Sequence, residues 1–196
     1  DKIDRVVMTS ATLTTSRGFD FIKERIGFQP DEELSLDAPF DYSRQALLYV
    51  PDDLPEPGDE TGVYVEGIAN RCRELVAVSG GKTFILFTSY ALLNQVYEKL
   101  DELQFQFPLI RQGDMPTGLM LKKFKEKPSV IFGTNSFWQG VDVPGGALQS
   151  VIITKLPFDV PKEPLTEARI EELRRQNIDP FRHYQIPRAI LQLKQG

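Results

Sequence analysis

The sequence has few of the residues that build covalent cross-links, metal centres or acid–base sites. It contains a single cysteine, Cys72, and a single histidine, His183. One cysteine excludes an internal disulfide and any cysteine-held metal cluster within the chain. We interpret His183 as structural, because it stands alone in the sequence. No nucleophile, base or metal cluster typical of a small-molecule α/β enzyme is found, which argues against that class.

Long apolar runs and a positive charge balance are also lacking. No run of about 18 apolar residues occurs and no charged segment precedes an apolar one, so the sequence predicts neither a membrane span nor a signal peptide. The net charge is −5, which argues mildly against a protein that coats nucleic acid. One dense cationic cluster suits a solvated helix face and a phosphate contact equally well. It consists of Lys122, Lys123, Lys125 and Lys127.

Short apolar runs alternate with amphipathic helical patterns along the chain. The runs predict strands at 5–9, 46–50, 83–87, 130–132 and 150–154, with a further strand and turn over 109–113. Helices are predicted over 19–26, 61–78, 89–103, 119–124, 163–176 and 187–194. This alternation is typical of an α/β fold in which a mainly parallel sheet carries helices on both faces.

The helix at 61–78 shows how the core is predicted. Ile68, Cys72 and Val76 lie on one stripe of it, so we expect Cys72 to be a buried, unreactive thiol. Gly80 and Gly81 should end the helix. The following Gly-Lys-Thr is no phosphate-binding P-loop, because the first glycine of that motif would fall on Val76 and the triplet precedes a strand instead of following one.

The stretch 130–144 carries the densest set of candidate site residues. A buried strand stops at Gly133 and opens into a polar loop, where parallel sheets place their ligands. Small hydroxyl and amide side chains, suited to a phosphate backbone, come first. An aromatic pair and a Gln-Gly-x-Asp cluster suited to a nucleotide follow. The polar residues are Thr134, Asn135, Ser136, Gln139, Gly140 and Asp142.

The string FWQGVDVPG at 137–145 resembles motif V of superfamily 2 helicases, in the version found in the DinG branch of the DinG/XPD family. Other strings follow the same family's order. SATL at 10–13 resembles motif III and FILFTSY at 84–90 resembles motif IV. Family-like strings also occur at 37–42, 112–113 and 155–158, and Gln195 would be the first residue of motif VI.

The resemblance implies the second RecA-like (P-loop NTPase-like) motor domain of an ATP-dependent DNA helicase. Residues 19–196 would form this domain and residues 1–18 a terminal strand and motif III segment of the first. We expect the chain to be cut within motif VI, so that alone it lacks the P-loop and the arginine fingers and hydrolyses no ATP. The complete protein would translocate 5′ to 3′ on single-stranded DNA, unwind forked or duplex DNA, and serve repair and replication in a bacterial cytoplasm.

The resemblance also implies roles for individual residues. On the nucleotide side it places Gln139, Gly140, Asp142 and Gln195; Ser10 and Thr12 would couple hydrolysis to movement. The nucleic-acid side would comprise Ser89, Tyr90, Gln112, Thr134, Asn135, Ser136, Phe137 and Lys155. ATP and Mg²⁺ would be held mainly by the first motor domain, and any iron–sulfur cluster would lie outside this chain, so that the chain alone binds no cofactor.

Some alternatives stay open at this stage. Ser89 is also a good helix N-cap, and Tyr90 would then be an ordinary half-buried aromatic residue. Phe137 and Trp138 could both stack on bases, but we expect one of them, Trp138, to pack in the core. The domain as a whole could instead be a non-catalytic nucleic-acid or protein-binding module that keeps the RecA-like fold.

Overall fold

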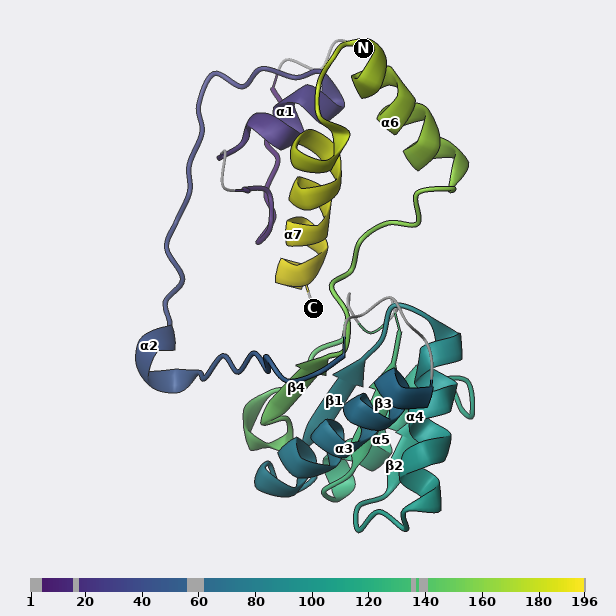
Figure 1. Ribbon diagram of the computed structural model, residues 1–196. Coiled ribbons are helices and arrows are strands. Elements are labelled where there is room, and N and C mark those ends of the chain that lie inside the picture. Colours follow the sequence, from purple (N-terminus) through teal and green to yellow (C-terminus); the bar gives the residue numbers. More distant parts are fainter. Residues whose placement is uncertain (1–4, 16–17, 56–61, 135–136, 138–140, 196) are drawn as a thin grey trace. The chain divides into compact units, whose positions relative to one another are not determined.

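A computed structural model describes residues 5–15, 18–55, 62–134, 137 and 141–195 (Figure 1). The chain divides into two compact units, which we describe separately. One spans Val50–Leu156, and the other combines Asp1–Tyr49 with Pro157–Gln195.

The first unit is built on a four-stranded parallel sheet with the strand order β2-β3-β1-β4. Its strands are β1 (Thr83–Leu86), β2 (Leu109–Arg111), β3 (Val130–Gly133) and β4 (Ser150–Ile153). The strand order differs from the order in the sequence, because β3 lies between β2 and β1. This order brings the ends of three strands with polar continuations to one edge of the sheet.

Helices cover both faces of this sheet, and the fold class predicted from the sequence is confirmed. The helices are α3 (Gly62–Val78), α4 (Tyr90–Glu102) and α5 (Thr117–Glu126), with a short 3₁₀ helix η2 (Gly145–Ala147) before β4. Successive strand residues point to opposite faces. Ile85 and Phe132 therefore pack in the core beneath α3 and α4, whereas Phe84 and Ile131 pack with Phe124 of α5.

Helix α3 ends as predicted. Gly80 has φ 64°, and the Gly81 N–H donates to the Val76 carbonyl at 3.0 Å, which satisfies the last turn. Cys72 is 1% exposed. Its burial raises the pKa of the thiol to about 12, because the apolar surroundings disfavour the thiolate. The prediction that Cys72 is buried is confirmed.

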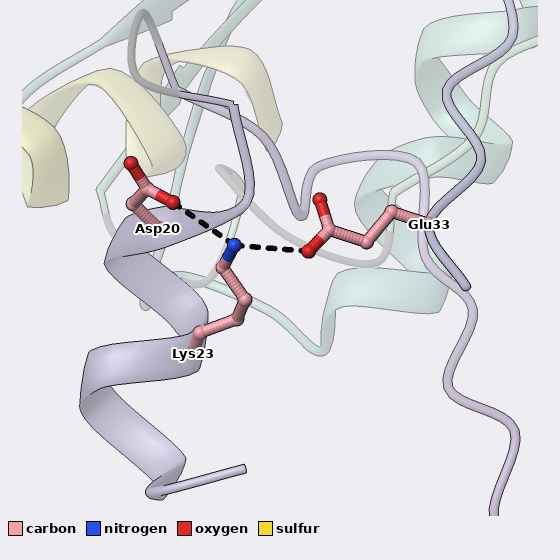
Figure 2. A network of polar contacts seen from close by, with 3 residues as sticks. All are labelled: Asp20, Lys23 and Glu33. Carbon is pink, nitrogen blue, oxygen red and sulfur yellow. Dashed lines mark hydrogen bonds and ion pairs between the residues drawn. The ribbon is translucent and has the colours of Figure 1, made fainter. Parts of the chain in front are cut away.

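The second unit is helical. It contains α1 (Asp20–Ile26), α2 (Tyr42–Gln45), α6 (Pro164–Arg175), the π-helical turn η3 (Phe181–Gln185) and α7 (Ile186–Gln195). Phe21, Ile170 and Tyr184 form its small core. Figure 2 shows how α1 is tied to the segment that follows it: the Lys23 ammonium lies 3.0 Å from Asp20 and 2.9 Å from Glu33. The hydrogen bond to Glu33, followed by that to Asp20, raises the pKa of Lys23.

Two predicted strands are wrong. Residues 5–9 and 46–50 are not assigned as strands, and Val7 and Leu47 are 86% and 92% exposed. A strand needs a ladder partner, and neither segment pairs with another strand among the described residues. In α1 the buried side chain is Phe21, and Ile26 is 46% exposed. No helix in the described ranges is long and apolar enough to cross a membrane.

Candidate functional site

The carboxyl edge of the sheet gathers residues from two of the family-like strings and from the segment after β3. Strands β1, β2 and β3 end at Leu86, Arg111 and Gly133. Polar residues follow each strand: Thr88 to Tyr90 come after β1 and Phe87, Gln112 comes directly after β2, and Thr134 comes directly after β3. Because the strands are parallel neighbours, these continuations meet at one edge.

Gln112 joins the three continuations through hydrogen bonds. Its Oε1 accepts from the Thr134 backbone N–H at 2.6 Å and from the Thr134 hydroxyl at 3.1 Å. Its Nε2 donates to the Tyr90 hydroxyl oxygen at 2.8 Å. Tyr90 and Thr134 each lie 22 residues from Gln112 in the sequence. The structure therefore brings together three residues that the sequence assigned independently to the same side of the domain.

The members of this network differ sharply in exposure. Tyr90 is 52% exposed, whereas Thr134 is 5% exposed. The hydroxyl and the N–H of Thr134 are both directed at Gln112. From the sequence we expected Thr134 to contact a bound strand. In this arrangement it cannot offer those two donors to the strand. Its place is behind Gln112, and Tyr90 is the outermost of the three residues.

Ser89 caps the helix that follows β1. It is the N-cap residue of α4, and its Oγ accepts from the Leu92 N–H at 3.2 Å. This satisfies one of the otherwise unpaired N–H groups of the first turn. The capping interpretation of Ser89 is thus confirmed, and the cap also fixes the position of the adjacent Tyr90 at the start of the helix.

Phe137 lies in the core and not at the surface. It is 4% exposed, and its ring meets that of Phe84 edge-on with centroids 6.1 Å apart. Its N–H donates to the Thr134 carbonyl at 2.8 Å. The expectation that Phe137 contacts nucleic acid is therefore corrected: a ring packed inside the sheet–helix core is not available for stacking on a base.

The rest of the loop is only partly described. Asn135, Ser136, Trp138, Gln139 and Gly140 lie outside the described residues. Asp142, the second residue after the description resumes, is exposed, so its carboxylate is accessible to a ligand.

Lys155 follows β4 and is half-buried. Its neighbour Thr154 is held firmly to the sheet, because the Thr154 hydroxyl donates to the Leu86 carbonyl at 3.0 Å. The Tyr64 hydroxyl donates to the Thr154 carbonyl at 3.2 Å. Lys155 thus starts from a fixed position at the carboxyl end of β4, beside the end of β1.

The second unit brings the two proposed coupling residues to the end of α7. The Gln195 amide Nε2 donates to the Thr12 hydroxyl oxygen at 3.1 Å, and the Ser10 and Thr12 hydroxyl oxygens are 3.4 Å apart. Lys194 Nζ donates to the Thr14 carbonyl at 2.9 Å. The motif III-like string and the first residue of the motif VI-like string are therefore in direct contact.

Sequence reasoning missed Arg111, the last residue of β2. Its guanidinium lies 4.6 Å from the centroid of the Tyr97 ring and 3.0 Å from the Asp114 carboxylate. The hydrogen bond to Asp114 raises the pKa of Arg111. The guanidinium therefore stabilises the turn that contains Gln112. An arginine at the end of a strand, three residues before an aspartate, is the local signal that could have indicated it.

The opposite edge of the sheet, at the amino ends of the strands, carries several lysines. A hollow of about 260 Å³ there is lined by residues that include Lys82, Lys125 and Lys127. Part of the cationic cluster seen in the sequence thus lies beside the start of β1, away from Gln112. Among the described residues, no group of three His, Cys, Asp or Glu side chains is placed to hold a metal ion.

Comparison with known proteins gives a consistent answer. Residues 72–196 match the model of the helicase C-terminal domain family. The chain is 39% identical over 191 residues to the ATP-dependent DNA helicase YoaA of Haemophilus influenzae and 38% identical to YoaA of Escherichia coli. It is 32% identical over 206 residues to the 3'-5' exonuclease DinG of Bacillus subtilis.

These alignments cover 97% of this chain but only 29%, 30% and 21% of the respective relatives. The chain therefore spans less than a third of the length of each of them. The family match extends from α3 through the carboxyl edge of the sheet to α7. The chain thus belongs to the helicase C-terminal domain family, in its DinG-like branch.

Proposed function

We propose that this chain is the second motor domain of an ATP-dependent DNA helicase and that the carboxyl edge of its sheet faces a single DNA strand. The observation that carries the proposal is the Tyr90–Gln112–Thr134 network, which joins two of the family-like strings to the residue after β3 at one edge. The relatives named as ATP-dependent DNA helicases support the reaction class. As in those relatives, the motor would need further parts outside this chain.

On the DNA side, the groups at this edge suit a sugar–phosphate backbone. Tyr90 is exposed and Lys155 is half-buried, which leaves a hydroxyl donor and an ammonium near the carboxyl ends of β1 and β4. Asn135 and Ser136, in the same loop as Thr134, would add amide and hydroxyl donors. Such donors position a strand without reading its sequence, as a translocating motor requires.

On the nucleotide side, the residues of this chain would supply only part of an ATP site. The exposed Asp142 carboxylate can accept hydrogen bonds from sugar hydroxyls. It cannot neutralise phosphate charge, so the phosphates and Mg²⁺ of ATP need cationic groups and a metal-holding carboxylate from elsewhere. We assign Gln139 and Gly140 to the same side as Asp142. Bound ATP would supply the phosphoryl-transfer chemistry, which this chain alone does not complete.

Coupling would run through two contacts. The loop that begins at Thr134 on the DNA side leads within a few residues to Asp142 on the nucleotide side. In the helical unit, Thr12 and Gln195 connect the motif III-like string with the start of motif VI. Binding or release of either ligand would therefore act on short segments that are directly bonded to each other. Movement would run 5′ to 3′ and separate duplex or forked DNA.

The experiment is ATP hydrolysis by the longer helicase protein, with and without single-stranded DNA. We expect DNA to stimulate hydrolysis, Asp142→Ala to abolish it, and Asp101→Ala, an exposed aspartate on α4, to leave it unchanged. The 196-residue chain alone should hydrolyse no ATP. A folded longer protein that binds DNA without hydrolysing ATP would show the domain to be a non-catalytic binding module instead.

A further inference from the structure

The orientation of the Gln112 amide is fixed by what surrounds it. An amide can usually be turned over, because its oxygen and nitrogen look alike. Here the Thr134 backbone N–H, which can only donate, lies 2.6 Å from one of the two atoms. That atom must be the oxygen. The Thr134 hydroxyl supplies a second donor to the same oxygen at 3.1 Å.

The amide orientation determines the polarity of the next hydrogen bond. Gln112 Nε2 carries two hydrogens and no lone pair that accepts, so it donates to the Tyr90 hydroxyl oxygen at 2.8 Å. The Tyr90 hydroxyl therefore accepts from Gln112 and keeps its own proton for another partner. Among the described residues it has no other hydrogen-bond partner. With Tyr90 52% exposed, that proton is free to reach an external acceptor.

We propose that the Tyr90 hydroxyl donates a hydrogen bond to a phosphate oxygen of the bound single strand, with Gln112 and Thr134 as positioning residues. The inference rests on the proposed function and specifies one of its contacts. Phosphate oxygens are charged acceptors, and O–H···O⁻ bonds are short and strong. A contact to phosphate is also available at every nucleotide, whereas a contact to a base acceptor would depend on sequence.

The buried part of the network explains how Gln112 and Thr134 support DNA binding by positioning Tyr90, without contacting DNA themselves. Thr134 is 5% exposed and directs both of its donors at one amide oxygen. The Ser89 cap holds the start of α4, where Tyr90 is the first helical residue. The position of the Tyr90 hydroxyl is therefore fixed both by the backbone at the start of α4 and by the hydrogen bond from Gln112. A donor held in this way loses less conformational entropy on binding than a freely rotating one.

The first test is binding of labelled oligothymidylate to the chain, followed by fluorescence anisotropy. Tyr90→Phe removes only the hydroxyl, and we expect it to weaken binding about tenfold, as for the loss of a hydrogen bond to a charged group. Tyr42→Phe is the matched control, because Tyr42 is 59% exposed in the other unit, and it should bind like the wild type. Thermal melting checks that each variant is folded.

The second test reverses the polarity of the network. In Gln112→Glu the carboxylate can still accept from Thr134, but it presents an acceptor to Tyr90 and turns the tyrosine proton inward. DNA binding should weaken about as much as in Tyr90→Phe while the melting temperature stays near that of the wild type. In the Tyr90→Phe background, Gln112→Glu should have little further effect. Gln106→Glu, at an exposed glutamine, measures the effect of the added charge alone.

The third test identifies the acceptor. With an oligonucleotide whose phosphates are replaced by neutral methylphosphonates, the wild type and Tyr90→Phe should bind equally. A difference that persists would overturn the phosphate contact in favour of a base contact. If the wild type binds DNA and Tyr90→Phe binds it as tightly, the inference fails while the proposed function stands. If the wild-type chain binds no single-stranded DNA, both fail.

Discussion

The ring of Phe137 packs directly against the backbone of Gly133, the last residue of β3. A Cβ placed on Gly133 would lie 2.7 Å from Cγ of Phe137, closer than carbon atoms approach. Glycine is therefore needed there for space. The contact fixes the position of the Phe137 ring beside the end of β3.

Gly133→Ala should destabilise the chain by about 1–3 kcal/mol, the usual cost of overpacking a core. The free energy of unfolding in urea measures this. Gly118→Ala on α5 is the control: its added methyl has nothing within 4 Å, and glycine to alanine inside a helix should stabilise by about 0.5–1 kcal/mol. Equal stability of Gly133→Ala and the wild type would show that Phe137 does not occupy this position.

Ser89→Ala should lower the free energy of unfolding by about 1 kcal/mol through the loss of the α4 cap. Ser89→Asn keeps a capping oxygen and adds no charge, so its stability should match that of the wild type. If Ser89→Asn also binds single-stranded DNA like the wild type, Ser89 acts only as a cap. A loss of binding without a loss of stability would instead restore a direct role in DNA contact.

Cys72 should react with a thiol reagent only when the chain unfolds, because the thiol is buried. The pKa of Cys72 is raised from 9.0 to about 12 in the folded chain. Above pH 9 the unfolded chain therefore releases the thiol proton while the folded chain keeps it, and stability falls as the pH rises. Between pH 8 and pH 10 we expect a loss of about 1 kcal/mol that is absent in Cys72→Ala. An identical pH dependence of the two proteins would contradict this burial.

Thr12→Val removes the hydroxyl oxygen that accepts from Gln195. In the longer helicase protein we expect DNA-stimulated ATP hydrolysis to fall several-fold while DNA affinity stays the same, because the contact joins coupling elements and does not touch the strand. Thr14→Val is the matched control, since Lys194 bonds only the backbone carbonyl of Thr14. Equal activity of the two variants would remove Thr12 from the coupling mechanism.

Local features were predictable from the sequence where local chemistry decides them. The apolar runs gave three strands within one residue of their observed ends, and Gly80 and Ser89 marked helix ends correctly. Residues 5–9 and 46–50 have the same apolar character but no ladder partner in the described chain. Composition indicates that a segment suits a strand; pairing decides whether it becomes one.

The candidate site was predictable as a set of residues but not as an arrangement. Tyr90 and Gln112 were recognisable from family-like strings and Thr134 from the polar loop after a predicted strand, yet their hydrogen bonds depend on β3 lying beside both β1 and β2. The sequence also did not indicate that Phe137 enters the core, where it is 4% exposed. The burial of Phe137 follows from the absence of a side chain on Gly133, which makes room for the Phe137 ring.

The central claim, that single-stranded DNA lies along the carboxyl edge of the sheet, is tested most directly by photo-cross-linking. Oligonucleotides carrying 4-thiothymidine would be irradiated with the chain, and the attached peptides identified by mass spectrometry. We predict cross-links in 88–90 and 134–142, which follow β1 and β3. Cross-links confined to the lysines of the opposite edge, such as Lys125 and Lys127, would contradict the account and place the DNA at the amino ends of the strands.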